Sequence, residues 1–388
     1  MRDAEELSKF SDLGGTRVPG GTNPAEISFL RAFALEQMSR TDEAVTAYLA
    51  IPDGRNEYYG MRATQRLLAL GRQDKSRAVV QMRLNALLNE TKSEQHEAAR
   101  VAAQSALRLT NDPKTRAELL TRLQAAYEAL PAYRFRQFDR SLRNLNRPLM
   151  DELFTLRLYD EALPEYVAAV GTVDPKSNEA YSIALLSLEA GFPNRAIRFA
   201  EPLWKTVPAD YVLELAPRDL VELLYPAPYR ASLLKHAPSR NVDPRFVLSI
   251  ARQESRFQAD AKSVAAARGM MQFIPATANQ IAGELKLTNF AQDDLYNADT
   301  AILFGSQYLS NLFKLFPDQP QAVAGSYNGG EDNLARWIAR SRATEADRYV
   351  PEIGFSQTKD YVYKVLANYW NYQRLYDVQL NPISQAVK

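Results

Sequence analysis

The sequence contains no cysteine and only two histidines, His96 and His236, among its 388 residues. Disulfide bonds and thiolate chemistry are therefore excluded, and few donors remain for a metal such as zinc, so we expect no metal site. No run approaches the roughly 18 apolar residues of a membrane span. The net charge of +1 gives no overall preference for nucleic acids or anionic membranes.

The composition is that of a globular protein, with 46% hydrophobic and 24% charged residues. A chain of 388 residues exceeds what one hydrophobic core usually serves, so we expect two or more domains. No alternating apolar and polar segment is long enough to indicate a strand, whereas helical periodicity recurs throughout. The sequence therefore predicts an all-α protein.

Short helical pairs recur in the first half of the chain. Ala44 and Ala78 lie 34 residues apart in similar contexts, and Ala162 and Ala196 repeat this spacing. The period, with a small residue where two helices approach, resembles degenerate tetratricopeptide-like repeats, which stack into a superhelix with a concave surface. An irregular helical bundle with coincidental spacing is the alternative.

Prolines mark the expected end of this region. Pro217, Pro226 and Pro228 fall close together, and proline cannot continue a helix. We therefore place a domain boundary at Tyr225. The predicted organisation is a lead-in over residues 1–23, a superhelical domain over 24–225 and a second domain over 226–388.

The most informative stretch begins at Asp243-Pro244, where an acidic cap and a proline at the first helical position predict a helix start. The apolar residues Val247, Ile250 and Phe257 follow at helical spacing, which places them on one face. Glu254 falls on the same face. Desolvation raises the pKa of a carboxyl, so this position favours a general acid near neutral pH. An ordinary glutamate at the rim of the helix is the alternative.

Glu254-Ser255 is followed by Gly269-Met270-Met271-Gln272 and by Ser326-Tyr327-Asn328-Gly329-Gly330. In this order the three motifs resemble the signatures of the soluble lytic transglycosylases, glycoside hydrolase family 23. The similarity extends from about residue 225 to about residue 376. It implies that the superhelix precedes a catalytic domain with a goose-lysozyme-like fold.

The resemblance implies cleavage of the β-1,4 bond between N-acetylmuramic acid and N-acetylglucosamine in peptidoglycan, with a 1,6-anhydromuramoyl end as product. Ordinary glycosidases use two carboxylates, but near the three motifs only Glu254 is a convincing candidate, so it would act as the single general acid and base. No cofactor is implied. The alternatives are a lysozyme-like hydrolase of the same bond and a catalytically inert repeat scaffold that binds peptidoglycan.

The expected partners are peptidoglycan strands and, through the superhelix, envelope proteins. Such a substrate lies outside the cytoplasm, whereas the polar residues 1–15 do not form a secretory signal. We therefore expect a periplasmic or otherwise extracytoplasmic protein whose export signal is missing from this sequence.

Six further residues are expected to contact substrate or line the cleft, five of them at matching family positions and Glu352 one residue away from such a position. Ser263 matches a substrate-binding serine, although serines also cap turns and helices frequently. Tyr327 matches a tyrosine whose hydroxyl points into the site beside the acid. The remaining expected contacts are Gln272, Ile274, Asn328 and Glu352.

The chain departs from the family pattern over residues 351–359. Relatives often read Glu-x-Ile-Pro-Phe-x-Glu-Thr-Arg there, and alignment on Ile353 places the family's first glutamate at Pro351. Glu352 could substitute for it only if the loop shifts by one residue. Gln357 and Lys359 replace an acidic and a guanidinium partner, and this altered loop motivates the inert-scaffold alternative.

Overall fold

The computed structural model describes residues 19–139 and 148–383, so most of the expected lead-in over 1–23 lies outside the described residues. The described residues form helices joined by turns, and their β-structure consists of three isolated bridges. The all-α prediction is confirmed. In the same ranges no helix is both long and apolar enough to cross a membrane.

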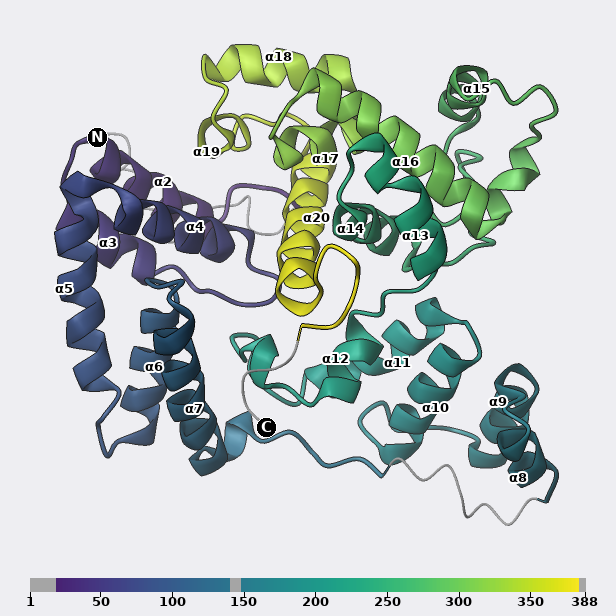
Figure 1. Cartoon of the computed structure of the whole chain (residues 1–388), viewed down its shortest axis with the longest axis horizontal. Coiled ribbons are helices and arrows are strands. Elements are labelled where there is room, and N and C mark those ends of the chain that lie inside the picture. The colour runs from purple at the N-terminus through teal and green to yellow at the C-terminus, as the bar shows by residue number, and fades with distance from the viewer. Residues whose placement is uncertain (1–18, 140–147, 384–388) are drawn as a thin grey trace.

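The first part of the chain is a series of helices in which neighbours along the chain pack on each other (Figure 1). They curve down one side of the molecule and across its lower edge, as expected for the predicted superhelix. The helices are α2 (Pro24–Gln37), α3 (Thr41–Leu49), α4 (Tyr58–Arg72), α5 (Asp74–Glu90), α6 (His96–Leu107), α7 (Pro113–Ala129), η2 (Pro131–Tyr133), α8 (Pro148–Thr155), α9 (Tyr159–Val170), α10 (Asn178–Glu189), α11 (Pro193–Trp204), η3 (Leu213–Leu215) and α12 (Arg218–Leu224).

The small residues of the repeat explain part of this packing. Ala44, Ala162 and Ala196 are fully buried, as their spacing predicted. Ala78 is exposed, because α5 turns Ser76 and Val80 inward instead. Ala78 lies two residues from both Ser76 and Val80, which is about 200° around the helix, so it faces solvent. Its 34-residue spacing from Ala44 is therefore coincidental.

The second part of the chain surrounds the long helix α20, which runs through the middle of Figure 1. Helices α14 and α17 pack directly on α20. The predicted boundary at Tyr225 falls between α12 and α13, and it stays a prediction. The helices are α13 (Arg230–His236), η4 (Pro238–Arg240), α14 (Pro244–Ser255), α15 (Pro275–Glu284), η5 (Gln292–Tyr296), α16 (Ala298–Leu315), α17 (Pro320–Gly329), α18 (Glu331–Ser341), α19 (Ala346–Tyr349) and α20 (Ser356–Leu375).

The N-terminal helices of the superhelix dock onto α20 through a buried polar cluster. Lys359 Nζ pairs with Glu26 Oε1 at 2.8 Å, and the two side chains are 5% and 3% exposed. One turn further along α20, the Tyr363 hydroxyl donates to Glu26 Oε2 (3.2 Å) and lies 3.0 Å from the Tyr59 hydroxyl. We call Glu26, Tyr59, Lys359 and Tyr363 the interdomain lock. Lys359, one of the departures from the family pattern, thus has its partner in the superhelix.

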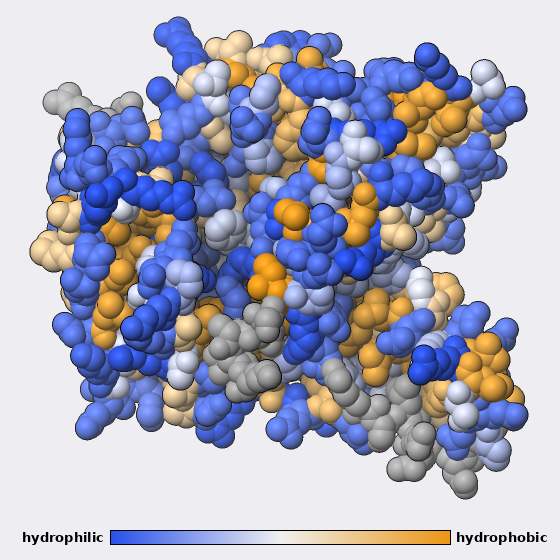
Figure 2. All heavy atoms as spheres, in the orientation of Figure 1, coloured by the Kyte–Doolittle hydropathy of each residue, from blue (hydrophilic) through white to orange (hydrophobic). Residues whose placement is uncertain are grey.

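The hydrophobic core is continuous from the superhelix into the second part of the chain. A small separate cluster, centred on Met150, Leu163 and Ile183, holds α8, α9 and α10 together. The face seen in Figure 2 is mostly hydrophilic, with apolar side chains scattered over it in small groups. Burial of shared apolar surface and the interdomain lock therefore fix the superhelix against α20.

Candidate functional site

The helix that carries Glu254 begins as the sequence predicts. Asp243 caps α14 by accepting a hydrogen bond from the backbone N–H of Arg245 (2.8 Å), and Pro244 occupies the first helical position. The helix ends at Ser255, earlier than the apolar pattern suggested. Arg256 and Phe257 both have positive φ angles, 52° and 68°.

Phe257 therefore lies beyond the helix, and its placement on the same helical face as Glu254 was wrong. The left-handed turn folds the chain back, so that the backbone N–H of Phe257 donates to the carbonyl of Ala251 (3.3 Å). The Phe257 ring is consequently buried by tertiary packing rather than by helical periodicity.

The Glu254 side chain is partly exposed, but the residues around it are buried. Ile250 and Val247, about one and two turns earlier, are fully buried. The Tyr361 hydroxyl of α20 donates to Glu254 Oε1 at 2.6 Å. Burial raises the pKa of Glu254 to about 7, although the hydrogen bond from Tyr361 acts in the lowering direction. This raised pKa agrees with the sequence-based expectation, and the role of Glu254 as a general acid stays a prediction.

The neighbouring arginines do not neutralise Glu254, because they are committed elsewhere. Arg252 donates to the carbonyl of Leu224 and to Asn368, and its guanidinium stacks over a tyrosine ring. Arg256 pairs with Glu201 of the superhelix at 3.2 Å. The acidity of Glu254 is thus set by burial and by one tyrosine.

The three sequence motifs are joined by hydrogen bonds. The Ser255 hydroxyl donates to the carbonyl of Met270 (2.9 Å), and the Tyr327 hydroxyl donates to the carbonyl of Met271 (2.7 Å). From α20, Thr358 donates to Asn328 Oδ1 (2.8 Å). Segments far apart in the sequence therefore assemble around Glu254.

The resemblance predicts one tyrosine beside Glu254, and the structure places two there, Tyr327 and Tyr361. Burial, and then the nearby Glu254 charge, raise the pKa of Tyr327 well above its ordinary value, so this ring lies close to the acid. Its hydroxyl, however, is committed to the carbonyl of Met271, whereas Tyr361 binds the acid directly. No local pattern in the sequence singles out Tyr361.

Ser263, Gln272 and Ile274 lie on the loop between α14 and α15. Ser263 Oγ accepts hydrogen bonds from the N–H groups of residues 265 and 267, as the capping alternative implies. Gln272 adopts a left-handed backbone (φ 52°), and its Nε2 donates to the carbonyls of residues 261 and 269. Ile274 is 46% exposed, which is unusual for isoleucine and leaves it free for a ligand. Their roles in substrate binding stay predictions.

Glu352 lies at the surface of the loop that departs from the family pattern. It pairs with Arg340 at 3.0 Å, with both side chains about half exposed. Within the described residues no contact joins Glu352 to Glu254. Its assignment to the substrate site also stays a prediction.

Glu254 lines a cavity of about 660 Å³ at the junction of the superhelix and α20. The superhelix contributes Asn23, Asn56, Glu57 and Glu201 to its wall. Among the expected substrate contacts Ser263, Gln272, Ile274, Tyr327, Asn328 and Glu352, none lines this cavity. The wall of this cavity therefore includes the superhelix, which the sequence did not indicate.

Within the described residues no second carboxylate contributes to the pKa shift of Glu254. Three other carboxylates share its cavity: Asp360 pairs with Lys364 (2.6 Å), Glu201 pairs with Arg256, and Glu57 has a pKa that burial raises. The shift in the Glu254 pKa has burial and Tyr361 as its causes, without a contribution from another acid. Across residues 19–139 and 148–383, no cluster of three or more acidic or histidine side chains is placed to hold a metal ion.

Residues 232–350 match the family described as the transglycosylase SLT domain. Those residues span α14, the loop that follows it and the Tyr327 motif. This part of the chain is an SLT domain.

Curated relatives match the same part of the chain. A putative soluble lytic murein transglycosylase of Haemophilus influenzae is 31% identical over 173 residues, which are 44% of this chain and 29% of that protein. The soluble lytic murein transglycosylase of Escherichia coli K12 is 28% identical over 151 residues, or 38% and 23% of the two chains. The chain thus covers less than a third of these relatives' length.

A solved structure extends the similarity in fold beyond the SLT domain. An inactive mutant of the lytic transglycosylase Slt from Pseudomonas aeruginosa matches 96% of this chain and 54% of its own, with a TM-score of 0.51 and 20% sequence identity. The arrangement of a helical superhelix and an SLT domain is therefore shared with that protein.

Proposed function

We propose that the chain is a peptidoglycan lytic transglycosylase that cleaves between N-acetylmuramic acid and N-acetylglucosamine and leaves a 1,6-anhydromuramoyl end. The observation that carries the proposal is the Glu254 carboxyl, which the Tyr361 hydroxyl binds at 2.6 Å and whose pKa burial raises to about 7 without a contribution from another acid in the described residues. A hydrolase of the usual kind needs a second carboxylate as nucleophile or base. The SLT domain and the names of the curated relatives support the same reaction.

A pKa near 7 suits a group that must first donate and then accept a proton. Protonated Glu254 donates to the glycosidic oxygen, while the 2-acetamido oxygen of the muramoyl residue stabilises C1. The Glu254 carboxylate then takes the proton of the C6 hydroxyl, which attacks C1 and closes the anhydro ring. Tyr361 holds the carboxyl in place during both transfers, because its hydroxyl binds Oε1.

The proposed substrate implies an extracytoplasmic location, where peptidoglycan strands are the partner. SLT-domain and superhelix residues both line the Glu254 cavity, so a strand bound in that cavity would contact the superhelix. Ser263, Gln272, Ile274, Tyr327, Asn328 and Glu352 are the proposed substrate contacts.

Digestion of purified sacculi with mass analysis of the products tests the proposal. A transglycosylase product is lighter by one water than the hydrolysis product, so the masses separate the two reactions. Glu254→Gln keeps the size of the side chain but cannot exchange the proton, and we expect a rate loss of at least about 100-fold.

The matched control is Glu118→Gln, which makes the same change at an exposed position of α7 and should cleave normally. Full activity of folded Glu254→Gln, or products that all carry reducing ends, would refute the proposal.

A further inference from the structure

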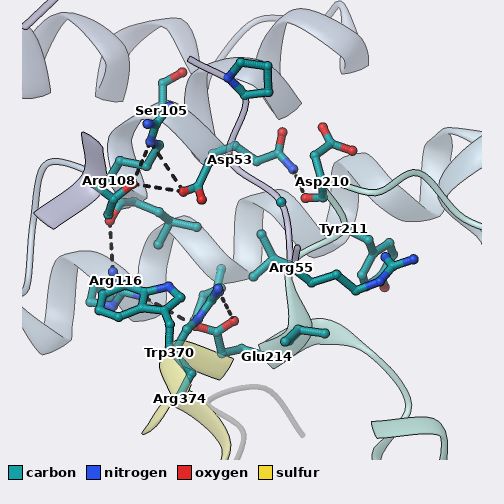
Figure 3. A pocket seen from close by; sticks show the side chains of 18 of the residues that line it. Asp53, Arg55, Ser105, Arg108, Arg116, Asp210, Tyr211, Glu214, Trp370 and Arg374 are labelled. Atoms are coloured by element: carbon teal, nitrogen blue, oxygen red, sulfur yellow. Dashed lines mark hydrogen bonds and ion pairs between the residues drawn. The ribbon is translucent and has the colours of Figure 1, made fainter. Parts of the chain in front are cut away.

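A second cavity, of about 890 Å³, lies between the superhelix and the C-terminal half of α20. Its walls come from α6, α7, the turn over residues 49–55, the segment over residues 209–214 and α20 (Figure 3). Trp370, which lines it, follows Tyr361 by nine residues, or about 14 Å along the helix axis. The cavity is thus separate from the Glu254 site, and its volume suits a small ligand.

The lining of this cavity has more positive than negative side chains. Three acidic residues face six arginines, which are Arg55, Arg100, Arg108, Arg116, Arg218 and Arg374. Two of the arginines have structural roles. Arg108 donates to four backbone carbonyls of residues 48–60, and Arg100 is bonded to Glu97 and Asp210.

Arg116 and Arg374 share one carboxylate. Arg374 donates to Glu214 through two nitrogens, while Arg116 Nη2 stands 3.6 Å from the same carboxylate, beyond hydrogen-bond reach. Arg116 Nη1 donates to the carbonyls of residues 107 and 110. Its Nε and Nη2 make no hydrogen bond within the described residues.

The positive charge of this cluster is therefore only partly compensated. Burial lowers the pKa of Arg116, the Glu214 charge opposes this shift, and the Arg374 charge adds to it. Burial also lowers the pKa of Arg55, whose Nη1 is buried with no hydrogen-bond partner in the described chain. Buried charges are normally paired, so an anion in this cavity would be favourable.

Trp370 supplies a flat apolar surface in the same cavity. Its side chain is partly exposed, and it lines the cavity together with Arg116, Arg374 and Glu214 (Figure 3). An aromatic face and a guanidinium group that line one cavity fit a ligand that joins a small ring or an acyl group to a carboxylate.

We propose that the cavity around Arg116, Arg374 and Trp370 is a second binding site, which takes a carboxylate-bearing fragment of peptidoglycan. The identity of the ligand rests on the proposed function, because the muramic acid lactyl group and the stem peptide are the carboxylates of that polymer. Arg116 receives the carboxylate on Nε and Nη2, and Trp370 packs against the remainder of the fragment. The site holds a fragment without cleaving it.

Intrinsic fluorescence tests the proposal, because the chain has only three tryptophans. The background is the full chain with Glu254→Gln, to prevent turnover, and Trp337→Phe, to remove the tryptophan of the SLT domain. The first probe is N-acetylmuramic acid, and N-acetylglucosamine is its matched control without a carboxylate. A stem tetrapeptide is the second probe, which distinguishes the two sources of carboxylate.

We expect saturable binding of at least one acidic probe and none of N-acetylglucosamine at the same concentration. Arg116→Met should weaken the binding at least tenfold. Arg77→Met, which removes an exposed arginine outside the cavity, should leave it unchanged. Trp370→Phe should remove the fluorescence change, and calorimetry on that variant measures the remaining affinity.

Arg116 also supports two carbonyls, so thermal unfolding of Arg116→Met is recorded first. If that variant unfolds, Arg116→Lys provides the test, because it keeps the charge but loses the forked donors and should still weaken binding. Equal binding of acidic and neutral sugars, no binding of either acidic probe, or unchanged affinity in a folded Arg116 variant overturns the site. Digestion of sacculi by the unmodified chain is a separate readout, so failure of the proposed reaction is distinguished from failure of this site.

Discussion

Breaking the interdomain lock should destabilise the protein strongly. Lys359→Met removes the ammonium group and leaves the Glu26 carboxylate buried, with its side chain 3% exposed and only tyrosine hydroxyls as partners. Removal of one partner from a buried ion pair costs about 3–5 kcal/mol. We expect a loss of stability of this size at pH 8.

The loss should depend on pH. Burial raises the pKa of Glu26 above its ordinary value of 4.5, whereas Lys359 acts to lower it. Without Lys359 the folded-state pKa rises further, so the folded protein binds a proton more tightly than the unfolded chain. Stability is then recovered as the pH falls through that raised pKa, and it is lost as the pH rises through it. The variant should therefore be closer to the unmodified protein at pH 5 than at pH 8.

Urea unfolding at pH 5 and pH 8 measures both effects. The double variant Glu26→Leu with Lys359→Met removes both charges and should recover most of the loss, because apolar replacement of a buried pair is often neutral. A Lys359→Met protein as stable as the unmodified one at pH 8 would refute the reasoning. So would a double variant no better than the single one.

Three further predictions concern the acid and its two tyrosines. The rate of sacculus cleavage should fall as the pH rises through about 7, because deprotonated Glu254 cannot donate, and a flat rate between about pH 6 and 8.5 would contradict this role. Tyr361→Phe removes a hydrogen bond that lowers the Glu254 pKa, so the basic limb of the pH profile should move to higher pH while kcat falls. An unmoved limb would show that this hydrogen bond does not affect the Glu254 pKa. Tyr327→Phe leaves the carbonyl of Met271 without its partner and should cost about 1–3 kcal/mol in urea unfolding, and an unchanged midpoint would show that water replaces the hydroxyl.

Local signals in the sequence determined the helical class and the position of the acid. The cap at Asp243 and the apolar residues Val247 and Ile250 depend on neighbours within a few turns, so they are readable from the chain and place Glu254 in buried surroundings. The same reasoning failed for Phe257, because the left-handed residues that end α14 are not visible in hydrophobic periodicity.

Only the tertiary structure decided how the acid is held and what surrounds it. Tyr361 lies 107 residues from Glu254, and Lys359 lies 333 residues from Glu26. Such contacts exist because α20 packs between the SLT-domain helices and the start of the superhelix, and no local pattern encodes that packing. The sequence therefore indicated which carboxyl to propose as the proton donor, and the fold decided which groups raise and lower its pKa.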